Sequence, residues 1–134
     1  MEPPTVVVVS NNPDIQQALA AALAKCGIAP IQSANAAEVN ALLQRRLVSL
    51  MFCSDELPGS ELNLLIRQNW LPVGRIPTVI VSRRDEWDHF VKFLQAGALD
   101  YVVYPLDEVE VLRVVGNALG PLQPKQSQKL AKAS

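Results

Sequence analysis

An alternation of a short apolar run with a helical segment, repeated five times, most constrains the fold of this chain. The first run, Thr5–Val9, is too short for a helix and is rich in β-branched residues, as buried strands are. Asn12 and Pro13 then form a typical helix start, and apolar residues recur at helical spacing up to Gly27. We therefore predict a strand followed directly by a helix.

The same alternation continues to residue 119. Asn35 and Glu38 are spaced as an N-cap and its return partner, Gly97 closes the fourth helix, and Asp107 caps the fifth. The further predicted strands are Ala29–Ser33, Val48–Cys53, Thr78–Val81 and Tyr101–Val103. The further predicted helices run from Asn35 to Arg46, Glu61 to Trp70, Asp85 to Ala96 and Asp107 to Leu119.

Strands that alternate with helices in this way predict an α/β domain with a doubly wound, five-stranded parallel sheet and five helices. Right-handed crossovers place the helices on both faces, so the strands become almost wholly apolar. Ligands of such sheets bind beyond the carboxyl ends of the strands. We expect one domain over residues 1–119 and a flexible tail or linker over 120–134, which contains Pro, Gln and Lys.

Composition narrows the function classes. The 134 residues are 49% hydrophobic and carry a formal net charge of −1, so we expect no direct nucleic-acid binding by this domain. No apolar stretch approaches the roughly 20 residues of a membrane span, which predicts a soluble, cytoplasmic protein without membrane contact. Cys26 and Cys53 lack a second Cys or His at metal-ligand spacing, so we interpret both as buried thiols.

The residues around the predicted strand ends resemble those of the receiver domain of bacterial two-component response regulators, over about residues 5–119. The matching segments, in order, are Ser10–Pro13, Ser54–Gly59, Ile76–Pro77, Ser82, Ala96–Val103 and Tyr104–Pro105. The resemblance implies a flavodoxin-like fold of the receiver type and a role in phosphorelay signal transduction.

Position by position, the resemblance also implies a degenerate phosphorylation pocket. The acidic pair that binds magnesium in the family is replaced by Ser10 and Asn11, and the phosphoacceptor aspartate by Ser54. Tyr104 stands where the family has a lysine, and we expect its ring to cover the emptied pocket. Only the hydroxyl residue expected after strand four is kept, as Ser82.

These replacements remove three parts of the phosphorylation chemistry. Magnesium usually needs at least one or two carboxylates, which neutral Ser10 and Asn11 do not supply. We expect no general base next to the Ser54 hydroxyl, because the single histidine, His89, falls on the polar face of the fourth predicted helix. No lysine remains to stabilise the transferred group. We expect no cofactor, no metal and no enzymatic activity, and a neutral pocket whose side chains bond to one another.

Asp55 is the one residue that could serve as an alternative phosphoacceptor. It is acidic and adjacent to Ser54, but neighbouring strand residues point to opposite sides of a sheet. We therefore interpret Asp55, together with Glu56, as a solvated loop acid rather than as the phosphoacceptor.

If phosphorylation is lost, function should lie on a surface. The family uses the face of helix four, strand five and helix five for dimerisation or partner contact, and Trp87 and Phe93 lie at the margins of the apolar arc of helix four. Tyr101 matches the family's aromatic position whose ring turns inward or outward with activation. The remaining apolar residues of this helix, Phe90, Val91 and Leu94, are expected in the core.

The resulting hypothesis is a pseudo-receiver, a protein-interaction module that contacts a protein partner, a fused output domain or a second copy of itself in a homodimer. Two alternatives stay open: a receiver with residual, noncanonical phosphorylation, and a small-ligand sensor that uses the strand-end pocket. An enzyme on this scaffold is not expected, because no glycine-rich phosphate loop follows the first strand and no nucleophile-base pair is evident.

Overall fold

The computed structural model describes residues 4–67 and 76–119. Strands and helices alternate through these residues as the sequence predicts. The strands are β1 (Val6–Val9), β2 (Ile31–Ser33), β3 (Leu50–Ser54), β4 (Thr78–Ser82) and β5 (Asp100–Val103). The helices are α1 (Pro13–Ala24), α2 (Ala36–Leu43), α3 (Gly59–Arg67), α4 (Trp87–Ala96) and α5 (Glu108–Leu119).

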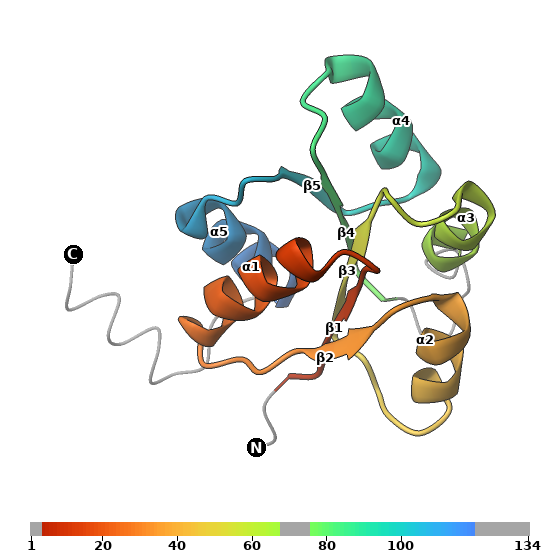
Figure 1. The fold of residues 1–134 in the computed structure, drawn as a ribbon, viewed down its shortest axis with the longest axis vertical. Coiled ribbons are helices and arrows are strands. Elements are labelled where there is room, and N and C mark those ends of the chain that lie inside the picture. The colour runs from red at the N-terminus through yellow and green to blue at the C-terminus, as the bar shows by residue number, and fades with distance from the viewer. Residues whose placement is uncertain (1–3, 68–75, 120–134) are drawn as a thin grey trace.

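All strand pairs are parallel, and the sheet order is β2-β1-β3-β4-β5. Helices α1 and α5 cover one face of the sheet, and α2, α3 and α4 cover the other, as Figure 1 shows. The doubly wound fold is therefore confirmed. The order reverses at β1, so the carboxyl ends of β1, β3 and β4 form the edge at which such sheets bind ligands.

The strand side chains divide between two cores. Val6, Val8 and Phe52 point toward α1 and α5, whereas Val7 and Met51 point toward α2, α3 and α4. All five side chains are at most 1% exposed. Because both faces are covered, the strands read as continuous apolar runs rather than as an alternating pattern.

The predicted helix boundaries are explained by specific caps. The Asn12 side chain accepts a hydrogen bond from the Asp14 amide at 2.9 Å. The Asn35 side chain likewise accepts one from the Glu38 amide. The Glu38 carboxylate returns to the amide of Ala34 rather than to that of the cap itself. Gly97 ends α4 at φ 117°, a left-handed conformation that favours glycine.

Several predicted boundaries differ from the structure by a few residues. β2 begins at Ile31 rather than Ala29, α2 ends at Leu43 rather than Arg46, and α4 begins at Trp87 because residue 86 is still extended. β3 runs on to Ser54, which continues the ladder with β4. The predicted end of the third helix at Trp70 and the proposed tail over 120–134 lie outside the described residues.

Within residues 4–67 and 76–119, none of the helices has the length and apolarity that a bilayer crossing requires.

Candidate functional site

Three buried serines follow or close the central strands. Ser10 comes directly after β1, Ser54 ends β3 and Ser82 ends β4, and each is at most 1% exposed. Their hydroxyl oxygens accept hydrogen bonds from the backbone amides two residues on, in Asn12, Glu56 and Arg84, at 3.0, 3.1 and 2.9 Å. Each serine therefore stabilises the turn that leaves its own strand.

This arrangement differs from the predicted mutual bonding of the pocket side chains. Among the contacts of the described residues, none joins two of the four side chains Ser10, Asn11, Ser54 and Ser82. Asn11 is exposed. A serine hydroxyl forms a hydrogen bond with a backbone amide two residues away more readily than with a side chain of another strand.

Asp55 is the centre of a hydrogen-bonded cluster with Ser82 and His89. The Ser82 hydroxyl donates to Asp55 Oδ2 at 2.6 Å, and His89 Nε2 lies 2.8 Å from the same oxygen. The side chains of His89 and Asp55 are only 10% and 12% exposed. The cluster links the end of β3, the end of β4 and the first turn of α4.

The interpretation of Asp55 as a solvated loop acid was therefore wrong. Because β3 ends at Ser54, Asp55 lies one residue beyond the strand, where the alternation of strand side chains no longer applies. His89 was also misplaced, since it faces the sheet rather than solvent. α4 begins at Trp87, and His89 then lies one turn before the buried Phe93 on the same side of the helix.

Aromatic rings enclose the cluster on the side of α4. The His89 ring meets Phe93 edge to face at 4.9 Å between centroids and Tyr101 at 5.9 Å. Tyr101 is 4% exposed, and its hydroxyl donates to the Arg84 carbonyl at 2.7 Å. Burial raises the pKa of the Tyr101 phenol above its ordinary value. The ring is thus turned inward and tied to the β4–α4 connection.

The position of Phe93 corrects one predicted contact residue. Phe93 is 5% exposed and belongs to the core beneath α2, α3 and α4, so it offers no free surface. Trp87, in contrast, is 72% exposed and stacks on Phe90 at 5.4 Å between ring centroids. Phe90 is half-buried against the core. Other exposed apolar side chains follow on the same part of the chain, namely Leu99, Val109 and Leu112.

Charged residues surround the remaining strand ends. The Glu56 carboxylate accepts from the Asn12 side-chain amide at 2.9 Å and forms an ion pair with Arg83 at 3.1 Å. The Arg83 guanidinium also lies 5.1 Å from the centroid of the Tyr104 ring, which packs half-buried against the core on the α1 and α5 side. Within the described residues, no three His, Cys, Asp or Glu side chains gather as a metal site.

Asp55 and His89 are 34 residues apart, so no local pattern could reveal their contact. The signal that could have found it is the spacing of His89 and Phe93, which are four residues apart and therefore lie on the same side of the helix.

Three curated proteins show the sequence relationship. The phosphate regulon transcriptional regulatory protein PhoB of Pseudomonas aeruginosa is 27% identical over 123 residues, 87% of this chain and 53% of that protein. The transcriptional regulatory protein AruR of the same organism is 31% identical over 131 residues, 92% of this chain and 52% of AruR. An uncharacterized 14.6 kDa protein of Leptolyngbya boryana is 28% identical over 112 residues, 82% of this chain and 86% of that protein. The chain thus spans about half the length of the two regulators.

No protein-family model matches the chain. Among solved structures, a response regulator from Thermotoga maritima is 28% identical with a TM-score of 0.76, covering 87% of this chain and 97% of its own. A response regulator receiver protein from Burkholderia phymatum is 26% identical with a TM-score of 0.76, covering 91% of this chain and 99% of its own. In sequence and fold the chain is therefore similar to the receiver domains of response regulators.

Proposed function

We propose that this chain is a pseudo-receiver, a receiver-like module that signals through protein contacts without aspartyl phosphorylation. The observation that carries the proposal is that the strand-end side chains form hydrogen bonds with one another or with the turns that follow their own strands. Ser54, at the position of the family's phosphoacceptor, accepts a hydrogen bond from a backbone amide. The adjacent carboxylate of Asp55 accepts a hydrogen bond from Ser82 and contacts His89. Both groups thus take part in hydrogen bonds within the protein.

The residues at this edge do not fit the magnesium ion that the resemblance implies. A magnesium site needs accessible oxygen ligands, usually with one or two carboxylates that keep their charge for the metal. Ser10 is buried in its turn, Asp55 faces His89, and Glu56 already pairs with Arg83. The proposal therefore contains no metal-dependent step.

The inward Tyr101 supports a single persistent conformation. By the resemblance, this ring turns between inward and outward positions in receivers that switch. Here the Tyr101 hydroxyl is bonded to the Arg84 carbonyl, and its ring packs against Phe93 and His89. The Asp55 cluster ties α4 to β3 and β4 by interactions within the protein, so the position of α4 does not depend on a phosphoryl group.

We place the partner surface on α4, the start of β5 and α5. Trp87 at 72% exposure and Val109 at 72% exposure are large apolar side chains without cover in the described structure, and Leu112 is 46% exposed. An exposed tryptophan is a common anchor of protein interfaces, and neighbouring exposed apolar side chains mark the same kind of surface. The partner would be a second copy of the chain, a separate protein or a fused output domain. The functions of the two longer regulators in Pseudomonas aeruginosa make a role in transcriptional regulation a further part of the proposal.

Residual phosphorylation on Asp55 is the second candidate function, because the structure brings this carboxylate to Ser82, the one site residue that the resemblance keeps. Incubation with acetyl phosphate and magnesium, followed by intact-mass spectrometry at neutral pH, separates the two candidates. We expect no phosphoryl adduct on the wild type or on Asp55→Asn. An adduct that is present in the wild type and absent in Asp55→Asn would reject the pseudo-receiver and establish the second candidate.

A further inference from the structure

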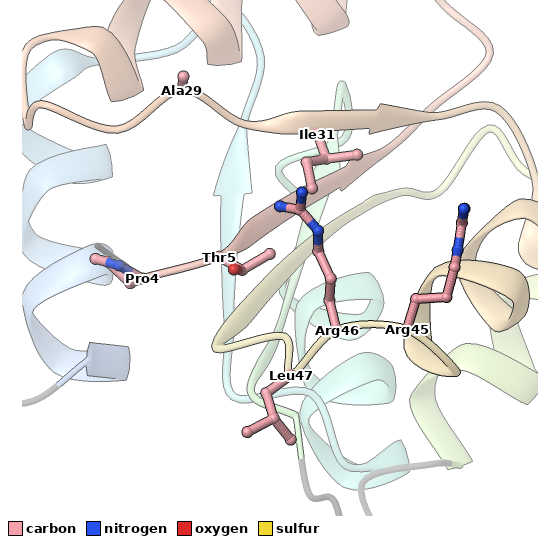
Figure 2. A pocket seen from close by; sticks show the side chains of 7 residues that line it. All are labelled: Pro4, Thr5, Ala29, Ile31, Arg45, Arg46 and Leu47. Atoms are coloured by element: carbon pink, nitrogen blue, oxygen red, sulfur yellow. The ribbon is translucent and has the colours of Figure 1, made fainter. Parts of the chain in front are cut away.

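A pocket with two arginines lies at the opposite end of the sheet from the Asp55 cluster. Its volume is about 620 Å³. It is lined by Pro4, Thr5, Ala29, Ile31, Arg45, Arg46 and Leu47. Figure 2 shows the Arg46 side chain extending from the loop between α2 and β3 toward Ile31, with Arg45 on the side of α2 and Leu47 below. The volume falls in the range of ligand-binding pockets.

The charge of this pocket is uncompensated by the described residues that surround it. The seven lining residues include two guanidinium groups and no carboxylate. Arg83, Arg84 and Arg113 each pair with a neighbouring carboxylate. Arg45 and Arg46 are exposed, and within the described residues neither takes part in an ion pair. Guanidinium groups are suited to carboxylates, which each can bind through paired hydrogen bonds.

The rim of the pocket is apolar. Leu47 is 92% exposed, the highest value among the large hydrophobic residues that the structure describes. Ile31, Ala29 and Pro4 supply further apolar lining. A ligand confined to the pocket would leave most of Leu47 in water, whereas an extended chain that crosses the rim would cover it. Arginine is also enriched among the residues that anchor protein interfaces.

We propose that this pocket, which we call the Arg45–Leu47 pocket, binds a short segment of a partner protein that carries a carboxylate beside an aliphatic or aromatic side chain. The carboxylate would pair with Arg45 and Arg46, and the apolar side chain would cover Leu47 and Ile31. Charge complementarity identifies the acidic part of the segment, and the exposure of Leu47 identifies the apolar part. The inference is independent of the phosphorylation state of the strand-end site.

Selection from a displayed library of random linear peptides on the purified 134-residue chain tests this proposal directly. We expect recovered peptides to be enriched in Asp or Glu beside Leu, Ile or Phe. NMR titration with the tightest synthetic peptide should shift the amides of Ala29, Ile31 and Leu47. Recovery of no peptide, or of peptides without acidic enrichment, would overturn the proposal.

Matched variants then assign the contacts. Arg45→Ser with Arg46→Ser should weaken binding of that peptide by about tenfold or more, and Leu47→Ser should weaken it severalfold. Lys25→Ser with Arg113→Ser removes an equal number of positive charges, from the C-cap of α1 and from α5, and should change binding by less than about twofold. Equal losses in the two double variants, with the fold of each verified by circular dichroism, would contradict a site at Arg45 and Arg46. So would a DNA oligonucleotide that binds through these arginines when no acidic peptide does.

Discussion

Asp55 organises the residues at the carboxyl end of the sheet. A single carboxylate oxygen receives the Ser82 hydroxyl and faces His89, and both partners are nearly buried. A buried carboxylate keeps its charge at low cost only when such partners replace the lost water. The stability of this edge should therefore depend on His89 and Asp55 jointly rather than on either residue alone.

A double-mutant cycle on this pair measures that dependence. We expect His89→Gln and Asp55→Asn each to lower the free energy of unfolding by about 1–3 kcal/mol, with a coupling energy of at least about 0.5 kcal/mol, in urea denaturation at pH 6. The control is the Lys25–Glu108 pair, whose side chains are 60% and 54% exposed. The same cycle there should give less than about 0.5 kcal/mol. Additive effects at His89 and Asp55 would show that the contact contributes nothing.

The phenol of Tyr101 provides a probe of the inward ring. Burial raises its pKa, so the folded state favours the neutral phenol. This contribution to stability is fully present below the ordinary tyrosine pKa and is lost as the pH rises through the raised value. The chain has two tyrosines, so in Tyr104→Phe an absorbance titration of tyrosinate follows Tyr101 alone. Ionisation at or below the ordinary value would indicate an outward, solvated ring.

At the scale of helices and strands, hydrophobic periodicity and caps were sufficient to predict the elements. The apolar run before Ser10 and the caps Asn12 and Asn35 are local signals, and the structure contains each of them. The Asp55 cluster could not be predicted in this way. It depends on where β3 ends and on which side of α4 faces the sheet. The prediction put Phe93 at the margin of the apolar arc, whereas Phe93 is buried and His89 lies one turn before it on the same side.

Two glycines make a matched test of helix geometry. Gly97 ends α4 at φ 117°, so Gly97→Ala forces an L-residue into a left-handed conformation and should cost about 1–2 kcal/mol of unfolding free energy. Gly116 lies within α5, and a methyl group there would meet nothing within 4 Å. Gly116→Ala should therefore stabilise the protein by about 0.5–1 kcal/mol. Destabilisation by both substitutions, measured by urea unfolding, would contradict this assignment.

At the scale of the whole molecule, the exposed apolar residues indicate where a partner binds. If the α4, β5 and α5 face forms a homodimer, Trp87→Ala with Val109→Ser should weaken self-association by about tenfold or more in analytical ultracentrifugation, with little change in unfolding free energy because both side chains are 72% exposed. Leu64→Ser on α3, where the side chain is 57% exposed, is the control and should leave association unchanged. Equal association of all three proteins would place the homodimer elsewhere or exclude it.

The central proposal is that the strand-end site works without metal or phosphoryl group, and an NMR titration of the wild-type chain with magnesium and beryllofluoride tests it most directly. Beryllofluoride imitates the phosphoryl group on an aspartate, so a functional acceptor would respond without any turnover. We predict no saturable shift of the Ser54, Asp55, Ser82 and Tyr101 amides at millimolar concentrations of both reagents. Saturable shifts confined to these amides would contradict the proposal and assign the chain to the receivers that switch by phosphorylation.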